Sequence, residues 1–142
     1  MTDSPSRLTW EPITLHLHNP WGLSYGVSET RQAFWLRLAN DAGWGEGTIP
    51  PYYQISHGSM ISFWEEISRR TDPFPDNPAD IGSWIGEDGP SPARSAIDIA
   101  LYDRIGRQLN LPLYRLLNLP RPKPLATSFT VSIATPEEMA RQ

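Results

Sequence analysis

The sequence predicts an α+β fold in which a three-stranded antiparallel meander is followed by a helical bundle. Three observations support this prediction. Apolar and polar residues alternate between residues 7 and 18, which is typical of a half-buried strand. A short polar turn over residues 40–43 joins two further strand-like runs. Six apolar residues then recur at helical spacing between residues 92 and 109: Ala93, Ala96, Ile97, Ala100, Leu101 and Ile105.

The first fifty residues form the predicted meander. The first strand covers residues 7–18 and places Ile13, Leu15 and Leu17 on one face. Residues 19–30 are rich in turn formers, so we expect a loop there that presents three large side chains, Trp21, Leu23 and Tyr25. The second strand covers residues 31–38, and the turn after it is short enough for a hairpin. The chain from Gly43 should therefore run back antiparallel.

Two helices are expected after the meander. Residues 50–56 form a second loop, with Tyr52 and Tyr53 adjacent, and a helix then covers residues 57–70. The inner face of that helix carries Met60, Ile61, Trp64 and Ile67. Three prolines make residues 71–78 a connection. Asn77 caps a short helix that ends at Gly89 and Pro90 and turns three side chains inward: Ile81, Trp84 and Ile85.

The long helix over residues 92–109 is the element around which the rest should pack. Ser91 suits the N-cap position, Pro92 the first helical position, and Asn110 the end of the helix. Ile99 and Tyr102 widen its apolar stripe beyond one face, so we expect cover on two sides. A second short helix follows over residues 112–117.

The prolines of residues 121–124 predict a domain boundary after residue 124. Residues 127–133 then predict one more strand, and Thr135 with Glu138 predicts a capping box that opens a helix. A lone strand and a short helix cannot bury their own apolar faces. This terminal unit should therefore pair with another chain, be disordered, or continue into a longer protein.

Composition excludes several classes of function. The chain has 142 residues, which suits one domain, and a net charge of −4 with a pI near 5.3, so nucleic acid is not an expected partner. It has no cysteine, and no window approaches the apolar length of a membrane span or a signal peptide. We expect a cytoplasmic protein with no membrane partner.

No residue pattern within the chain predicts a catalytic centre. His16 and His18 share a strand face but lack a third ligand nearby, so a surface role is favoured over a metal site. A glutamate such as Glu46 in a glycine-rich strand more often pairs with an arginine than acts as an acid. The glycines around it do not match a dinucleotide fingerprint. Asp103 and Arg107 are spaced for a helical ion pair.

Two stretches of the sequence resemble a known family. Residues 91–119, SPARSAIDIALYDRIGRQLNLPLYRLLNL, and residues 127–140, TSFTVSIATPEEMA, are similar to the segment that joins the capping domain to the first barrel strand in the enolase superfamily, in its muconate-lactonising subgroup. GWGEGTIPPYY (43–53) and SYGVSETRQAFWLRL (24–38) look most like dipeptide epimerases. The resemblance covers residues 8–142.

The resemblance implies an enolase-like capping domain over residues 1–124, with residues 125–142 as the first strand and the start of the first helix of a truncated (β/α)8 barrel. The complete enzyme would be a magnesium-dependent isomerase that moves a proton next to a carboxylate of a small acidic or dipeptide substrate. Its lysines and metal ligands would lie beyond residue 142, so this chain would hold no catalytic residue, metal ligand or cofactor. Its partner would be the missing barrel.

The resemblance also implies a set of substrate-binding residues: Trp21, Leu23, Tyr25, Tyr52, Tyr53 and Thr130. Two alternatives stay open. Within the family, the parent enzyme could be a muconate cycloisomerase or an o-succinylbenzoate synthase. Outside catalysis, the chain could be a binding module that assembles with a second copy through its C-terminal strand.

Overall fold

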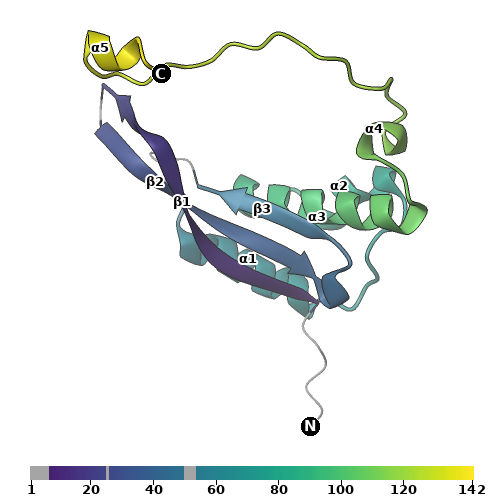
Figure 1. Ribbon diagram of the computed structural model, residues 1–142. Helices are drawn as coiled ribbons and strands as arrows, with labels where there is room; N and C mark the ends of the chain where they lie inside the picture. Colours follow the sequence, from purple (N-terminus) through teal and green to yellow (C-terminus); the bar gives the residue numbers. More distant parts are fainter. Residues whose placement is uncertain (1–6, 25, 50–53) are drawn as a thin grey trace.

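The computed structural model describes residues 7–24, 26–49 and 54–142, and it confirms the α+β prediction (Figure 1). Three antiparallel strands lie in the order β1–β2–β3, and helices α1 and α3 cover one face of the sheet. The elements are β1 (Leu8–Leu23), β2 (Gly26–Leu38), η1 (Ala39–Asp41), β3 (Trp44–Thr48), α1 (His57–Arg69), η2 (Pro78–Asp80), α2 (Ile81–Ile85), α3 (Ser91–Leu109), α4 (Leu113–Leu116) and α5 (Pro136–Met139).

The prediction of a loop over residues 19–30 is wrong, because most of these residues belong to strands. β1 continues to Leu23 and β2 begins at Gly26, so Trp21 and Leu23 are strand residues. The turn formers lie instead in an irregular stretch of the ladder, between the pairs His16–Thr30 and Trp21–Ser28. A bulge of this kind absorbs extra residues in one strand without ending the pairing.

The core lies between the inner face of the sheet and helices α1, α2 and α3. Trp64 is fully buried and donates its indole N–H to the Ala93 carbonyl at 3.0 Å, while Phe34 meets it edge-on at 5.2 Å. Phe63 replaces Ile61 on the buried face of α1, since Ile61 is only half-buried. All six apolar residues predicted for the buried face of α3 are fully buried: Ala93, Ala96, Ile97, Ala100, Leu101 and Ile105.

Glycines on the inner side of β3 let helix α3 rest almost directly on the strand backbone. A Cβ atom on Gly45 would stand 1.9 Å from the Ala96 carbonyl oxygen, and one on Gly43 would stand 2.1 Å from that of Ala100. Real Cβ atoms do not approach so closely, so only glycine fits. The glycine pattern of residues 43–47 is therefore a packing feature.

The start and end of α3 follow the local capping rules, with a shift of one residue at the start. Ser91 is the first helical residue and not the N-cap, because the Pro90 carbonyl accepts the first helical hydrogen bond, from Arg94 N at 3.0 Å. Asn110 ends the helix in the left-handed conformation, as predicted. The preceding helix α2 ends at Gly86 and not at Gly89, since Gly86 has a φ of 85°.

Arginine side chains hold the connection between α1 and η2 against the core. Arg7 lies over the Phe74 ring at 4.4 Å and donates to the Asp72 carbonyl at 2.6 Å. Arg104 on α3 donates to the Pro75 carbonyl at 3.0 Å and pairs with Asp76 at 2.8 Å. These bonds satisfy backbone carbonyls that a proline-rich stretch leaves without ladder partners.

The strand predicted over residues 127–133 does not form in the described structure. Residues 119–131 run without regular secondary structure from the end of α4 to the hairpin end of the sheet (Figure 1). A strand requires a neighbour to bond its backbone, and here only Ile133 N bonds to a strand, at Gly22 O. The capping box after it is confirmed, with Thr135 and Glu138 bonding reciprocally at the start of α5. Among the helices described, none has the length and apolarity to cross a bilayer.

The packing of α3 on β3 leads to a stability prediction. Gly45→Ala forces a methyl group against the Ala96 carbonyl, so we expect the free energy of unfolding, measured in urea, to fall by about 3 kcal/mol. Gly82→Ala in α2 is the control, because nothing lies within 4 Å of its new Cβ. We expect that variant to gain up to about 1 kcal/mol from helix propensity. Equal effects of the two substitutions would contradict the close approach.

Candidate functional site

The tip of the β1–β2 hairpin meets the C-terminal segment in a small joint formed by Pro20, Gly22, Ser132 and Ile133, which we call the hairpin joint. The Ser132 hydroxyl accepts from Gly22 N at 2.6 Å and donates to Pro20 O at 2.7 Å. Ile133 N donates to Gly22 O at 3.3 Å. Two stretches 110 positions apart in the chain are thereby linked by three hydrogen bonds.

The hairpin joint is closely packed. Ser132 is only 4% exposed and is the sole buried polar side chain within the ranges that the structure describes. A Cβ atom on Gly22 would stand 2.5 Å from the Ile133 carbonyl oxygen, so the approach depends on glycine. Ser132 N also donates to Gln142 Oε1 at 2.8 Å.

The structure brings only part of the predicted substrate-binding set near this joint. Trp21 and Leu23 flank Gly22 on β1 and are half-buried. Because side chains alternate along a strand, both belong to the face opposite to that of Gly22. Thr130 is exposed, two residues before Ser132. The other predicted residues, Tyr25, Tyr52 and Tyr53, lie outside the described residues.

Ser132 and Gly22 carry the contact, although the sequence analysis did not single them out. A glycine between two large apolar residues was visible and could have suggested a close approach of backbone. Nothing local to Ser132 indicated a partner, because its hydrogen bonds are made to residues near the other end of the chain.

A cavity of about 410 Å³ opens beside the hairpin joint. Its lining mixes polar and apolar residues from the hairpin and from the chain around α5: Asn19, Pro20, Gly22, Val27, Ile133, Ala134, Glu138, Arg141 and Gln142. Hydrogen bonds with Thr135 hold the pKa of Glu138 below its usual value, and the bond with the Thr135 side chain contributes more than the bond with its backbone. The Glu138 carboxylate lines this cavity and accepts hydrogen bonds from Thr135 N at 3.0 Å and Thr135 Oγ1 at 2.8 Å.

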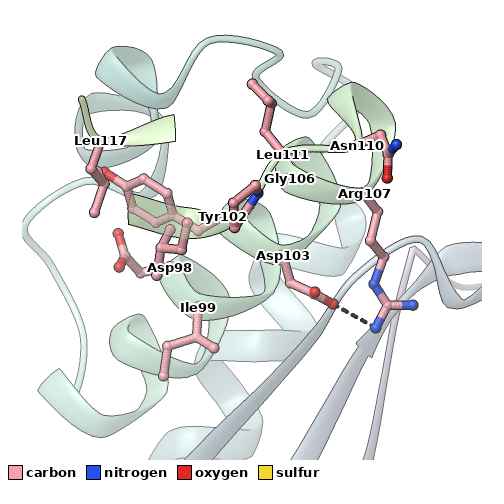
Figure 2. A pocket seen from close by; sticks show the side chains of 11 residues that line it. Asp98, Ile99, Tyr102, Asp103, Gly106, Arg107, Asn110, Leu111 and Leu117 are labelled. Carbon is pink, nitrogen blue, oxygen red and sulfur yellow. Dashed lines mark ion pairs between the residues drawn. The ribbon is translucent and has the colours of Figure 1, made fainter. Parts of the chain in front are cut away.

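A larger groove of about 750 Å³ runs along α3 and α4 (Figure 2). Trp21, Leu23 and Thr130 are not among the residues that line it. Its apolar walls include Ile99, Leu113 and Leu117, and Ile99 is 42% exposed. Burial in this groove raises the pKa of Asp98. The second cover expected over Ile99 is therefore not provided by the described part of the chain, whereas Tyr102 is half-buried against the core.

The predicted ion pair on α3 is confirmed at the edge of this groove. Asp103 and Arg107 are 2.9 Å apart, and Figure 2 shows the pair. Asp103 also accepts from Trp44 N at 2.9 Å, and Arg107 lies over the Trp44 ring at 4.5 Å. The pair thus ties the start of β3 to α3, which is a structural role.

The residues described do not fit a metal ion. Across residues 7–24, 26–49 and 54–142, no group of three or more His, Cys, Asp or Glu side chains is arranged to hold one. His16, His18 and Glu46 are all exposed on the sheet.

No protein-family profile matches the chain. It is, however, 33% identical over 137 residues to an L-Ala-D/L-Glu epimerase from Bacteroides thetaiotaomicron. This alignment covers 92% of this chain and 35% of the epimerase. It is also 29% identical over 140 residues to an N-succinyl-L-Arg/Lys racemase from Bacillus cereus. That alignment covers 92% of this chain and 37% of the racemase.

The solved structures agree with these relatives. The N-succinyl Arg/Lys racemase from Bacillus cereus superposes with a TM-score of 0.71 at 28% identity, over 94% of this chain and 38% of its own. A dipeptide epimerase from Cytophaga hutchinsonii, complexed with Mg and D-Ala-L-Val, gives a TM-score of 0.74 at 24% identity, over 96% of this chain and 39% of its own. The structural neighbours of this chain are enolase-superfamily N-terminal domains.

The homologues of this chain are thus dipeptide epimerases and other members of the enolase superfamily. The chain spans between 35% and 41% of the length of the epimerases and the racemase that it matches almost from end to end. In the enolase-superfamily fold this portion is the three-stranded sheet with its helices.

The raised pKa of Asp98 leads to a pH prediction. Because the pKa of Asp98 is raised above its ordinary value of 3.8, the folded state holds the Asp98 proton more tightly than the unfolded state does. The free energy of unfolding therefore decreases as the pH rises through the raised folded pKa. Asp98→Asn removes this penalty. We expect a higher midpoint of urea unfolding at pH 7 and little change at pH 3.

The control for Asp98→Asn is Asp88→Asn, which removes the same charge from an exposed loop residue. If the two variants shift the midpoint equally at pH 7, then net charge and not burial in the groove explains the effect.

Proposed function

We propose that this chain is the substrate-specificity portion of a magnesium-dependent epimerase or racemase of the enolase superfamily. Residues 1–124 would form the capping domain, and residues 125–142 the first strand and the start of the first helix of a (β/α)8 barrel. The observation that carries the proposal is the alignment, which covers 92% of this chain but only 35% of an L-Ala-D/L-Glu epimerase.

The exposed apolar surface of the C-terminal segment supports a barrel role for residues 125–142. Leu125 is 88% exposed and Phe129 is 72% exposed, and with Val131 and Ile133 they follow the period of two that a strand requires. A strand with one apolar face needs a second layer to cover that face and neighbouring strands to bond its backbone. Neighbouring barrel strands would supply both the hydrogen bonds and the apolar cover that this segment lacks here.

The groove along α3 and α4 supports the same proposal. Its exposed leucines and Ile99 form an apolar face for which the described chain provides no cover. Large exposed apolar patches on soluble proteins mark interaction sites. We propose that the barrel portion of the protein covers at least part of this face.

The proposed reaction is proton transfer at a carbon next to a carboxylate, as the names of the epimerase and racemase relatives suggest. Magnesium would supply charge stabilisation of the enediolate in the complete enzyme. We place the metal ligands and the acid–base groups in the barrel portion, so the chain alone would be catalytically incomplete. The substrate would be a dipeptide or an N-modified amino acid, the two classes named among the relatives.

The role proposed for this chain is selection of the substrate side chain. Trp21 and Leu23 on the hairpin and Thr130 on the C-terminal segment belong to elements that the hairpin joint brings together. Tyr25, Tyr52 and Tyr53 complete the proposed set. Selection by apolar contact of this kind is worth roughly 1–3 kcal/mol per group that is lost, which appears mainly in the affinity.

A second candidate function is a binding module that assembles through residues 125–133 with a second copy of the chain. The exposed apolar alternation in that segment also favours this candidate, because an unpaired strand edge is a template for pairing between chains.

Reconstitution tests the catalytic proposal. The chain is mixed with the barrel portion of the Bacteroides thetaiotaomicron epimerase, and epimerisation of L-Ala-D-Glu is followed with magnesium present. We expect a stable complex and turnover in the mixture, with no turnover by the chain alone. Turnover by the chain alone, or a barrel that neither binds it nor becomes active, would contradict the proposal.

Deletion of residues 125–142 separates the two candidates. If the chain forms a dimer through its C-terminal segment, size-exclusion chromatography should show that the deletion gives a monomer. A dimer that survives the deletion would exclude assembly through this segment.

The specificity role predicts an effect on affinity in the reconstituted enzyme. We expect Trp21→Ala to raise KM for the dipeptide about tenfold and to change kcat by less than about twofold, since it removes apolar contact with the substrate. Trp44→Ala is the matched control, because Trp44 is exposed on β3 and its ring packs on Arg107. Equal KM values for the two variants would remove Trp21 from the site.

A further inference from the structure

We propose that Ser132 is a positioning residue, which locks the β1–β2 hairpin onto the C-terminal segment and so sets the place of the hairpin's side chains relative to Thr130. It would control substrate affinity without contacting the substrate. This inference rests on the proposed function and goes beyond it, because Ser132 and Gly22 were not among the proposed substrate-binding residues.

The Ser132 hydroxyl makes both of its hydrogen bonds to backbone groups of the hairpin. A serine hydroxyl has one proton to donate, and Ser132 donates it to Pro20 O at 2.7 Å while accepting from Gly22 N at 2.6 Å. At 4% exposure the hydroxyl has little water to bond instead. Removing it would leave a buried amide and a carbonyl without partners, which is costly.

The hairpin joint occupies the free edge of the sheet. β1 is an edge strand, because the strand order is β1–β2–β3. Gly22 donates its N–H to Ser132 Oγ and accepts from Ile133 N through its carbonyl, so both of its backbone groups are bonded to the C-terminal segment. The serine hydroxyl therefore stands where a neighbouring strand would offer a carbonyl oxygen.

Contacts on both partners limit movement at the hairpin joint. On the hairpin side, the missing Cβ of Gly22 allows the Ile133 carbonyl to lie where a side chain would be. On the other side, Ser132 N is bonded to Gln142 Oε1, and the capping box of Thr135 and Glu138 fixes the turn that leads into α5. Ser132 is thus held in place by its own segment when it binds the hairpin.

The consequence concerns the residues that flank the hairpin joint. Trp21 and Leu23 are each adjacent to Gly22, and Thr130 is two residues from Ser132. A shift at the joint would move these groups relative to one another. Misplacement of about 1 Å at a binding or reacting group is enough to weaken an enzyme substantially.

Hydrogen exchange on the intact chain tests the hairpin joint directly. We expect the Gly22 amide to exchange at least about tenfold faster in Ser132→Ala than in the wild type, because a bond of this kind contributes about that factor. Ser128→Ala is the control, since Ser128 is an exposed serine of the same segment. Unchanged exchange within α3 shows that each variant is folded. Gly22→Ala, which fills the space of the Ile133 carbonyl, should expose the segment around Ile133 to faster exchange.

Kinetics of the reconstituted enzyme test the positioning role. We expect Ser132→Ala to raise KM about tenfold with kcat within about twofold of the wild type, whereas a purely structural defect would lower kcat through a smaller active fraction. If the Gly22 amide exchanges as slowly in Ser132→Ala as in the wild type, the proposal that Ser132 holds the hairpin is overturned. Faster exchange with an unchanged KM overturns the positioning role. An inactive wild-type mixture counts against the proposed function, and the exchange result still decides the joint.

Discussion

The close approach of strand β3 to helix α3 is the constraint on which the rest of this structure depends. Gly45 on β3 and Gly43 just before it lie against the carbonyls of Ala96 and Ala100, so the helix axis sits nearer the sheet than ordinary side chains would allow. That position leaves room for Trp64 of α1 to bond Ala93 and to pack on Phe34. The bond from Trp44 N to Asp103 then fixes the register of strand on helix. The sheet and the helices therefore share one core, from which the β1–β2 hairpin extends.

The same arrangement explains which surfaces remain apolar and open. Helix α3 turns its small side chains to β3 and buries Ile97, Leu101 and Ile105, while Ile99 faces outward into the groove with the leucines of α4. The C-terminal segment adds Leu125 and Phe129, which are also exposed. Both surfaces are apolar and lack cover from the described part of the chain, and the alignments span 35% and 37% of two relatives. Helix α5 and the β1–β2 hairpin, whose residues line the smaller cavity, lie far from α4 (Figure 1).

The site was predicted less completely than the fold. The sequence indicated that Trp21 and Leu23 matter as large side chains near glycine, but it placed them in a loop, because Asn19 and Pro20 are turn formers. In the structure the pairing of β1 with β2 absorbs those turn formers in an irregular stretch and then resumes at Trp21. Local propensity yields to strand pairing here, since the ladder supplies hydrogen bonds that a loop would have to find in water.

The sequence by itself determined the parts that depend on neighbours along the chain: the buried face of α3, its end at Asn110, the hairpin of β2 and β3, and the capping box at Thr135. Each follows from periodicity or capping within a few residues. Only the tertiary structure decided why Gly45 must be glycine, that residues 127–133 lack a strand partner within the described chain, and that Ser132 binds Gly22. These features join residues about fifty to more than a hundred positions apart, and no local pattern specifies which distant backbone a side chain will meet.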